Sequence, residues 1–178
     1  SWRCARIRSP FVRPDRLSLA LVLALAASAG CQLRPPARIP DCAGSLVSTL
    51  DLAGDFLIHE RIRVRGDRVD EAYGLVAQKT GDRLVLVGLT PFGATAFTLA
   101  QVGLDVESDS RLGRALPVPP ENVLRDFHRA HFLAIDGTEL ENRRVRRDAD
   151  GVVHITSVAC GYEATLAPVR TGGTAGKP

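Results

Sequence analysis

The sequence is poor in the features that mark several common protein classes. It has no methionine, one tryptophan and only 5% aromatic residues among 178 positions, which argues against platforms that stack single-stranded nucleic acid. It also lacks the G-x-S-x-G, P-loop, G-x-G-x-x-G, C-x-x-C and H-E-x-x-H motifs, the signatures of hydrolase, nucleotide, redox and metalloprotease sites. We therefore expect no enzymatic activity, no cofactor and no metal. Because methionine is absent, we do not expect Ser1 to be the natural first residue.

The longest uncharged apolar run is too short to cross a bilayer. Leu17–Ala29 has thirteen residues and would rise about 20 Å as a helix, short of the ~30 Å hydrocarbon core. Five arginines and one aspartate precede it. A basic stretch, a short apolar run and small residues are typical of a secretory signal peptide, which we expect over residues 1–30.

Cys31 stands directly after the small residues that end this segment. The pattern resembles the bacterial lipobox, which implies cleavage before Cys31 and acylation of that cysteine. Two or three acyl chains would attach the protein stably to a membrane, whereas one chain anchors it only reversibly. Gln32 follows, where aspartate would retain such a lipoprotein in the inner membrane, so the resemblance implies an outer-membrane location facing the periplasm. The alternative is an ordinary secretory signal with an incidental cysteine.

The positive charge of the sequence belongs to this leader. Five of the 23 Lys and Arg residues and one of the 20 Asp and Glu residues lie before Cys31, so residues 31–178 carry 18 basic against 19 acidic side chains. A nearly neutral protein gives no electrostatic reason to expect a nucleic acid partner.

The remaining chain is organised as a tether, one domain and a tail. Residues 31–44 hold Cys31 and the stretch QLRPPARIPD, with three prolines in ten residues. Such a stretch is extended and predicts a tether. We expect one domain over residues 45–170 and a disordered tail over residues 171–178.

Alternation of apolar and polar residues predicts an antiparallel sheet. Residues 83–89 are apolar on both faces, which predicts a central strand covered on both sides. Pro119 and Pro120 predict the first turn of a helix that runs to about Phe132, and Ser45–Leu52 is expected as a short helix. The predicted strands are residues 55–66, 69–79, 83–89, 95–102, 104–107, 140–147, 152–159 and 162–169. The fold class is α+β, mostly β, with the sheet wrapped around one or two helices.

The segment Arg83–Glu107, with Leu-Thr-Pro-Phe-Gly at Leu89–Gly93, resembles the outer-membrane lipoprotein receptor LolB. The spacing of Leu116-Pro117 and Asn122–Phe127 continues the likeness, which is closest to a small uncharacterised family of bacterial LolB-like lipoproteins. This resemblance implies an open half-barrel sheet with helices over an apolar cavity that accepts acyl chains. The alternative is a filled core, which is usual for close-packed interiors. The candidate residues of the ligand face are Leu86, Leu89, Phe97, Leu99, Leu124 and Phe127.

The turn Thr90-Pro91-Phe92-Gly93 places a large apolar residue at its tip. Proline suits the second position of a turn and glycine the fourth. Phe92 either folds back onto the sheet or protrudes. In the LolB family the apolar residue of this turn protrudes and assists membrane insertion of cargo, which implies that role for Pro91, Phe92 and Gly93.

Three further groups of residues carry interpretations. Cys42 and Cys160 remain after Cys4 and Cys31 are assigned to the leader and the anchor, and an oxidising periplasm favours a disulfide between them. His128 and His131 could serve zinc, but without a third ligand they are better explained as surface or core histidines. Arg143–Arg147 predicts a solvated edge strand, with contact to anionic headgroups as the alternative.

The leading hypothesis is a non-enzymatic, outer-membrane-anchored lipoprotein that binds acyl chains and helps to place lipidated or lipid-like cargo in the membrane. Its partners would be membrane lipid and cargo, handed over by a periplasmic carrier. The second hypothesis is a structural or accessory lipoprotein with a filled core that acts through protein contacts. A lipid hydrolase is a third possibility, disfavoured because the sequence has no nucleophile motif.

Overall fold

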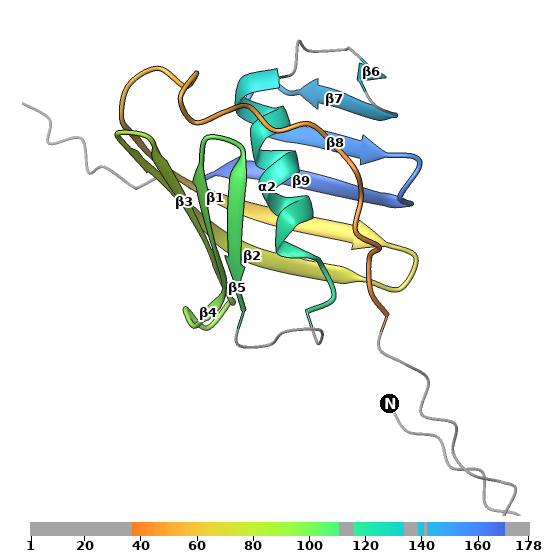
Figure 1. The fold of residues 1–178 in the computed structure, drawn as a ribbon. Coiled ribbons are helices and arrows are strands. Elements are labelled where there is room, and N and C mark those ends of the chain that lie inside the picture. The colour runs from red at the N-terminus through yellow and green to blue at the C-terminus, as the bar shows by residue number, and fades with distance from the viewer. Residues whose placement is uncertain (1–36, 111–115, 134–138, 141, 170–178) are drawn as a thin grey trace, which may run out of the picture. The chain divides into compact units, whose positions relative to one another are not determined.

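The computed structural model describes residues 37–110, 116–133, 139–140 and 142–169 (Figure 1). The chain divides into residues 1–35 and residues 36–178, and every described residue belongs to the second unit. The predicted signal peptide, Cys31 and the tail at residues 171–178 lie outside the described residues.

A single antiparallel sheet makes up most of the domain. Its spatial order is β5-β4-β3-β2-β1-β9-β8-β7-β6, and the strand at each end is paired on one side only among the described residues. The sheet is therefore open, and the expected α+β, mostly-β class is confirmed. The strands are β1 (Phe56–Gly66), β2 (Asp70–Thr80), β3 (Arg83–Leu89), β4 (Thr95–Val102), β5 (Asp105–Asp109), β6 (Glu139–Leu140), β7 (Arg143–Arg147), β8 (Val153–Ser157) and β9 (Tyr162–Pro168).

One helix lies against the concave face of this sheet, and the strands curve around it (Figure 1). Helix α2 (Pro120–His128) carries proline in its first turn, as the sequence predicts, and continues as a π-helical turn, η2 (Arg129–Leu133). Val123, Leu124 and Phe127 are at most 1% exposed. They pack into one continuous core with the inward-facing residues of the sheet, so burial of this apolar stripe is what holds the helix in place.

The strands show the alternation that the sequence predicts. In β1, Ile62 and Val64 are fully buried, whereas Arg63 between them and the arginines on either side, Arg61 and Arg65, are exposed. The prediction for residues 83–89 is only half right. Their inward side chains are buried, but Val85 and Val87 on the outer face are half-buried. Within the described chain, α2 covers one face only, and valine suits an outer position because it fits a pleated surface.

The short helix expected at Ser45–Leu52 is absent: the segment is irregular and ends in a turn. Its backbone groups bond to each other only in the closing turn, where Asp51 N–H donates to the carbonyl of Ser48 (2.9 Å), and several others bond to distant parts of the chain. The N–H of Val47 donates to His128 Nδ1 (3.1 Å), and the N–H of Thr49 donates to the carbonyl of Gly103 (3.0 Å). The Thr49 hydroxyl donates to the carbonyl of Asp82 (2.6 Å). These tertiary bonds override a weak local preference for helix.

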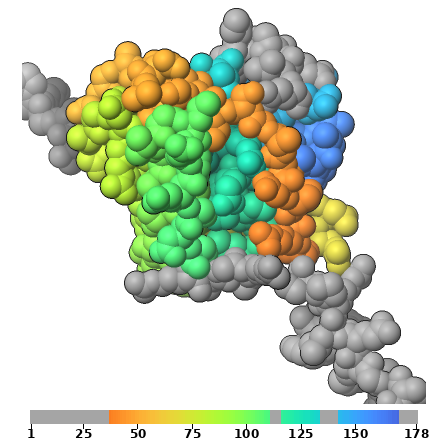
Figure 2. All heavy atoms as spheres, viewed as in Figure 1, coloured from red at the N-terminus to blue at the C-terminus, as the bar shows by residue number. Residues whose placement is uncertain are grey.

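The segment leading up to it packs on the domain, although residues 37–44 are expected in the tether. Ile39 is 4% exposed and Cys42 1% exposed, both within the core. The amide side chain of Asn122 bonds to backbone on both sides of Asp41, accepting from Cys42 N–H (2.9 Å) and donating to the carbonyl of Pro40 (2.7 Å). Residues 40–47 thus run alongside α2, and the space-filling view shows this segment lying beside the helix (Figure 2).

The predicted disulfide between Cys42 and Cys160 is present, with Cα atoms 6.2 Å apart and a sequence separation of 118. It joins the segment beside α2 to the turn between β8 and β9. The single strand expected at residues 140–147 is divided into β6 and β7. Asn142, which lies between them, has a φ of 59°, a left-handed conformation that a continuous strand does not accommodate.

Candidate functional site

The turn between β3 and β4 projects an aromatic ring into solvent. The N–H of Gly93 donates to the carbonyl of Thr90 (2.9 Å), and the N–H of Thr90 donates to the carbonyl of Ala94 (2.8 Å). The Thr90 hydroxyl also accepts from Ala94 N–H (3.1 Å). Gly93 has a φ of 80°, which glycine adopts without steric cost. The turn is therefore fixed by its own bonds, and Phe92 at its tip is 97% exposed.

An amphipathic cavity of about 580 Å³ lies beside this turn. Its lining includes Leu89 at the end of β3, Pro91 of the turn, Tyr73 of β2 and the arginines Arg61 and Arg63 of β1. The hydroxyl of Tyr73 is buried without a hydrogen-bond partner. Burial raises the pKa of Tyr73 to about 12, so the hydroxyl stays protonated and available as a donor at neutral pH.

The turn shares one end of the sheet with the beginning of the described chain. The strand registers place the β1–β2 turn at the same end as the β3–β4 turn, because Gly74 pairs with Leu89 and Arg65 pairs with Asp70. Residues 37–40 line a pocket with Asp67 and Val69 of the β1–β2 turn. The described part of the chain thus begins at the end of the sheet that carries the Phe92 turn.

This end of the sheet is rich in arginine. Arg63 makes a two-pronged bond to Asp70, at 2.7 Å for both Nε to Oδ1 and Nη2 to Oδ2. The same pairing lowers the pKa of Asp70. The exposed cations of this end are Arg38, Arg61, Arg63, Arg65 and Arg68, and the exposed carboxylates of β1, β2, their turn and the neighbouring part of β9 are Asp67, Asp70 and Glu163, which pairs with Arg65 in the sheet register. The surface around the turn therefore favours anions.

Most of the candidate acyl-binding residues lie inside the packed core. Leu86, Phe97, Leu99, Leu124 and Phe127 are each at most 1% exposed. They belong to one contiguous cluster of buried side chains. The sixth candidate, Leu89, is half-buried and lines the cavity beside the turn. The structure thus separates Leu89 from the other five and places it next to Phe92.

A buried hydrogen-bonded chain explains His128. Its Nδ1 accepts from Val47 N–H, so Nε2 carries the proton and donates to Gln101 Oε1 (2.8 Å). The Gln101 amide nitrogen in turn donates to the carbonyls of Val47 (2.9 Å) and Gly103 (2.8 Å). Burial, with a smaller contribution from nearby His131, lowers the pKa of His128 to about 4. His128 is accordingly a neutral structural histidine.

The second histidine of the helix end has a different partner. His131 Nε2 lies 3.1 Å from Glu60 Oε2, and Glu60 is 6% exposed. The two histidines therefore serve separate contacts, as the interpretation of surface or core histidines requires. Within the described ranges, no group of three or more histidine, cysteine, aspartate or glutamate side chains is arranged to hold a metal ion.

Asp126 is the most deeply buried carboxylate on α2, at 1% exposure. Burial raises its pKa to about 6, although Arg143, the Tyr162 hydroxyl, Arg129 and Arg125 all act in the opposite direction. The Tyr162 hydroxyl donates to Asp126 Oδ2 (2.8 Å). Desolvation of the carboxylate thus outweighs attraction to three guanidinium groups.

The prediction of a solvated edge strand at Arg143–Arg147 is wrong for one of its arginines. Arg144 and Arg146 are exposed on the outer face, but Arg143 is 1% exposed. Arg147 is exposed as well, although it donates from Nη2 to the carbonyl of Ala130 at the helix end (2.8 Å). The strand is also not at the edge, because β6 pairs with it. Val145, the apolar residue of this run, is 4% exposed, and at a spacing of two residues Arg143 faces the same side of the strand.

Two comparisons bear on this chain. A profile of the family described as "Protein of unknown function (DUF3261)" matches residues 61–166, which run from β1 to β9. No curated protein matches the chain. Among the described residues, the helices are too short or too polar to cross a membrane.

Proposed function

Because the chain belongs to the DUF3261 family, whose description assigns no activity, we propose its function from the geometry of the Phe92 turn. The protein is a non-enzymatic lipoprotein, anchored through Cys31 in the outer membrane and facing the periplasm. Its β3–β4 turn enters the lipid surface and assists the placement of acyl-bearing cargo, which a periplasmic carrier delivers.

The observation that carries this proposal is the exposure of Phe92. A phenylalanine that is 97% exposed on a turn held by its own hydrogen bonds gains free energy only when something apolar covers it. Burial of such a side chain stabilises the bound state by about 1.5–3 kcal/mol. That is enough to hold the turn in a bilayer for part of the time and too little to anchor a protein.

The surroundings of the turn support a lipid surface as that apolar partner. Arginines cluster at the same end of the sheet, and basic side chains near a membrane attract anionic lipids. The chain enters the domain at this end as well, at residues 37–40 beside the β1–β2 turn. Only residues 32–36 separate Cys31 from this point, so a lipid on Cys31 would hold the Phe92 end toward the membrane.

The cavity beside the turn offers a place for part of an acyl chain. It combines Leu89 and Pro91 with the arginines of β1, which suits a molecule that has an apolar chain and a polar head. The resemblance of Leu89–Gly93 to LolB-like lipoproteins supports the same function. In this proposal the acyl site lies next to Phe92, and the five core residues keep a structural role.

The test is vesicle flotation of the full chain carrying Cys31→Ser, so that no anchor contributes. We expect the parent chain to float with vesicles of phosphatidylethanolamine and phosphatidylglycerol, and Phe92→Glu to lose this binding roughly 10- to 100-fold. Leu104→Glu is the matched control, since Leu104 is a 63% exposed apolar residue in the turn at the other end of β4. Equal binding by Phe92→Glu and its control would contradict the proposal.

A second candidate function has its own supporting observation. The packed core around Leu86, Phe97 and Phe127 favours an accessory lipoprotein that acts through protein contacts and holds no lipid. Mass spectrometry of lipids that copurify with the protein separates the two functions. A bound acyl lipid that Leu89→Glu displaces supports cargo placement, whereas a lipid-free protein supports the accessory role.

A further inference from the structure

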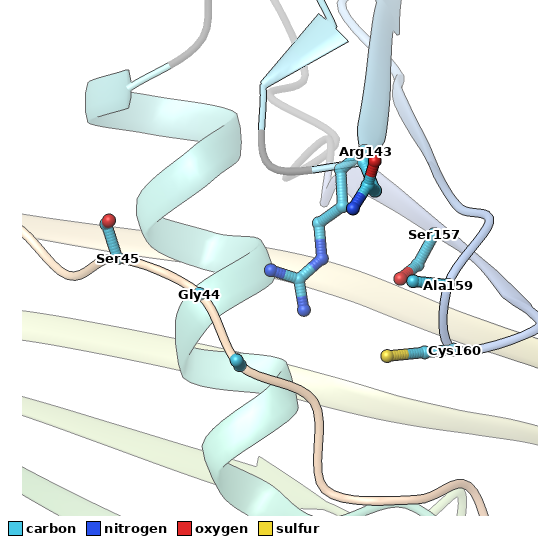
Figure 3. Close-up of a pocket in the computed structure, with 8 residues that line it drawn as sticks. Gly44, Ser45, Arg143, Ser157, Ala159 and Cys160 are labelled. Atoms are coloured by element: carbon cyan, nitrogen blue, oxygen red, sulfur yellow. The ribbon is translucent and has the colours of Figure 1, made fainter.

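A second pocket lies where residues 43–45 pass the start of β7 and the end of β8. Its volume is about 480 Å³. Figure 3 shows the side chain of Arg143 extending across it, with its guanidinium between the Gly44–Ser45 segment and the turn that carries Ala159 and Cys160. The lining residues used below are Gly44, Ser45, Asn142, Arg143, Ser157 and Cys160.

Arg143 is buried without the hydrogen bonds that a buried guanidinium requires. Its side chain is 1% exposed, and Nε, Nη1 and Nη2 all lack a hydrogen-bond partner. A charged group buried in this way costs free energy unless other groups pair with it and accept its hydrogen bonds. The guanidinium is a rigid fork that suits the two oxygens of a carboxylate or phosphate.

Asp126 does not meet this need. Its Oδ1 lies 3.8 Å from Arg143 Nε, beyond hydrogen-bond distance, and Oδ1 itself has no partner. The other oxygen is held by Tyr162. The carboxylate therefore balances part of the charge of Arg143 from one side, while Nη1 and Nη2 remain without acceptors.

The pocket wall is built to leave room for this guanidinium. Gly44 faces it so closely that a Cβ at this position would collide with Arg143 Nη1. The Cys42–Cys160 disulfide holds the segment before Gly44 to the β8–β9 turn, which fixes the width of the pocket. Ser157, on the neighbouring strand β8, is paired with Arg143 in the sheet register and adds a hydroxyl to the lining.

We propose that this pocket binds an oxyanion of the phosphate or carboxylate class, which accepts hydrogen bonds from the Arg143 guanidinium. The site is distinct from the Phe92 turn, and its existence does not depend on the proposed function. Two sources supply this chemistry, a free anion such as inorganic phosphate and the headgroup of a phospholipid.

The experiment uses the full chain with Cys31→Ser and measures binding of inorganic phosphate by titration calorimetry. We expect saturable binding that Arg143→Gln weakens roughly 10- to 100-fold, the loss that follows from removing hydrogen bonds between charged groups. Arg146→Gln is the matched control, because Arg146 lies on the same strand with its side chain exposed, and its affinity should equal that of the parent chain.

A second variant protects the test against misfolding of Arg143→Gln. Gly44→Val keeps the arginine but fills the space in front of it, so it should weaken binding to a similar extent, with folding verified by circular dichroism. The second arm repeats the comparison in the Phe92→Glu background with phosphatidylglycerol vesicles, where the turn no longer contributes.

The two arms identify the source of the anion. Binding of inorganic phosphate that depends on Arg143 and Gly44 supports the site with a free anion. Vesicle binding alone, with the same dependence, supports it with a lipid headgroup. The proposal is overturned if the parent chain binds neither probe, or if Arg143→Gln and Gly44→Val bind as tightly as Arg146→Gln.

Discussion

His128 and Gln101 are joined by a buried hydrogen bond of 2.8 Å between Nε2 and Oε1. This bond links the last residue of α2 to the inward face of β4, and both side chains also hold Val47. A single neutral imidazole thus connects the helix, the sheet and the N-terminal segment. Protonation of Nδ1 would remove the acceptor for Val47 N–H and place a charge in the core.

The pH dependence of stability should reveal His128. Its pKa in the folded protein is about 4, below the ordinary value of about 6.5, so the unfolded chain binds more protons and stability is lost as pH falls from about 6.5 to about 4. The separation of the two pKa values corresponds to about 3 kcal/mol. We expect the free energy of unfolding, measured with urea at pH 7 and pH 4.5, to fall less between these pH values in His128→Gln than in the parent protein. His59→Gln, at an exposed position of β1, should keep it, and an unchanged slope in His128→Gln would refute the assignment.

Asp126 should make stability depend on pH in the direction opposite to that of His128, in nearly the same pH range. Its pKa in the fold is about 6, above the ordinary 3.8, so the folded protein binds more protons and loses stability as pH rises from about 4 to about 6. The stability of the parent protein relative to Asp126→Asn should therefore increase by about 3 kcal/mol as pH is lowered from 7 to 4. Urea unfolding of both proteins across this range measures it, with Asp105→Asn at the exposed start of β5 as control. If the difference in stability between the two proteins stays constant with pH, the pKa of Asp126 is not raised in the folded protein.

Replacing glycine by alanine should affect stability differently at two strand positions, Gly88 and Gly74. A Cβ on Gly88 would collide with the ring of Phe97, which is 1% exposed and cannot move aside. Overpacking of this kind costs about 1–3 kcal/mol. A Cβ on Gly74 would meet Leu89 Cβ at 3.6 Å, an ordinary contact. We expect the thermal midpoint to fall in Gly88→Ala and to stay level or rise in Gly74→Ala. The same response in both variants would count against the packing described for Phe97.

Loss of the disulfide should destabilise the domain strongly. The bridge spans 118 residues, for which the loop-entropy model gives about 5 kcal/mol. The double variant Cys42→Ser, Cys160→Ser should unfold at correspondingly lower urea, and reductant should shift the parent protein to the same midpoint. If reductant leaves the parent protein unchanged while mass mapping shows free thiols, the bridge is not contributing to stability.

The sheet and the helix were predictable because their signals are local. Alternation in β1, with Ile62 and Val64 inward and Arg61 outward, determines which face is buried, and Pro120 marks the first turn of α2. The exposure of Phe92 was left open between two alternatives, because a turn sequence specifies backbone shape and not what lies beside it.

The pocket of Arg143 was not predictable from the sequence. A run of arginines predicts a solvated strand, and only the approach of Gly44, about one hundred residues earlier in the chain, shows that one of them is enclosed. The prediction of a helix at residues 45–52 was wrong for a related reason. The N–H of Val47 donates to His128 and not to a carbonyl within a helix. No local sequence pattern indicates that such a distant side chain will be the acceptor.

The pairing of β1 with β9 determines when the domain can fold. Gly66 pairs with Tyr162 and Glu60 with Pro168, so the first and last strands meet at the middle of the sheet. A nascent chain that lacks its final strand has two separate sets of strands and no continuous sheet. Closure of a loop of this length comes late and slowly. The sheet therefore becomes continuous only when residues 162–168 are available to pair with both β1 and β8.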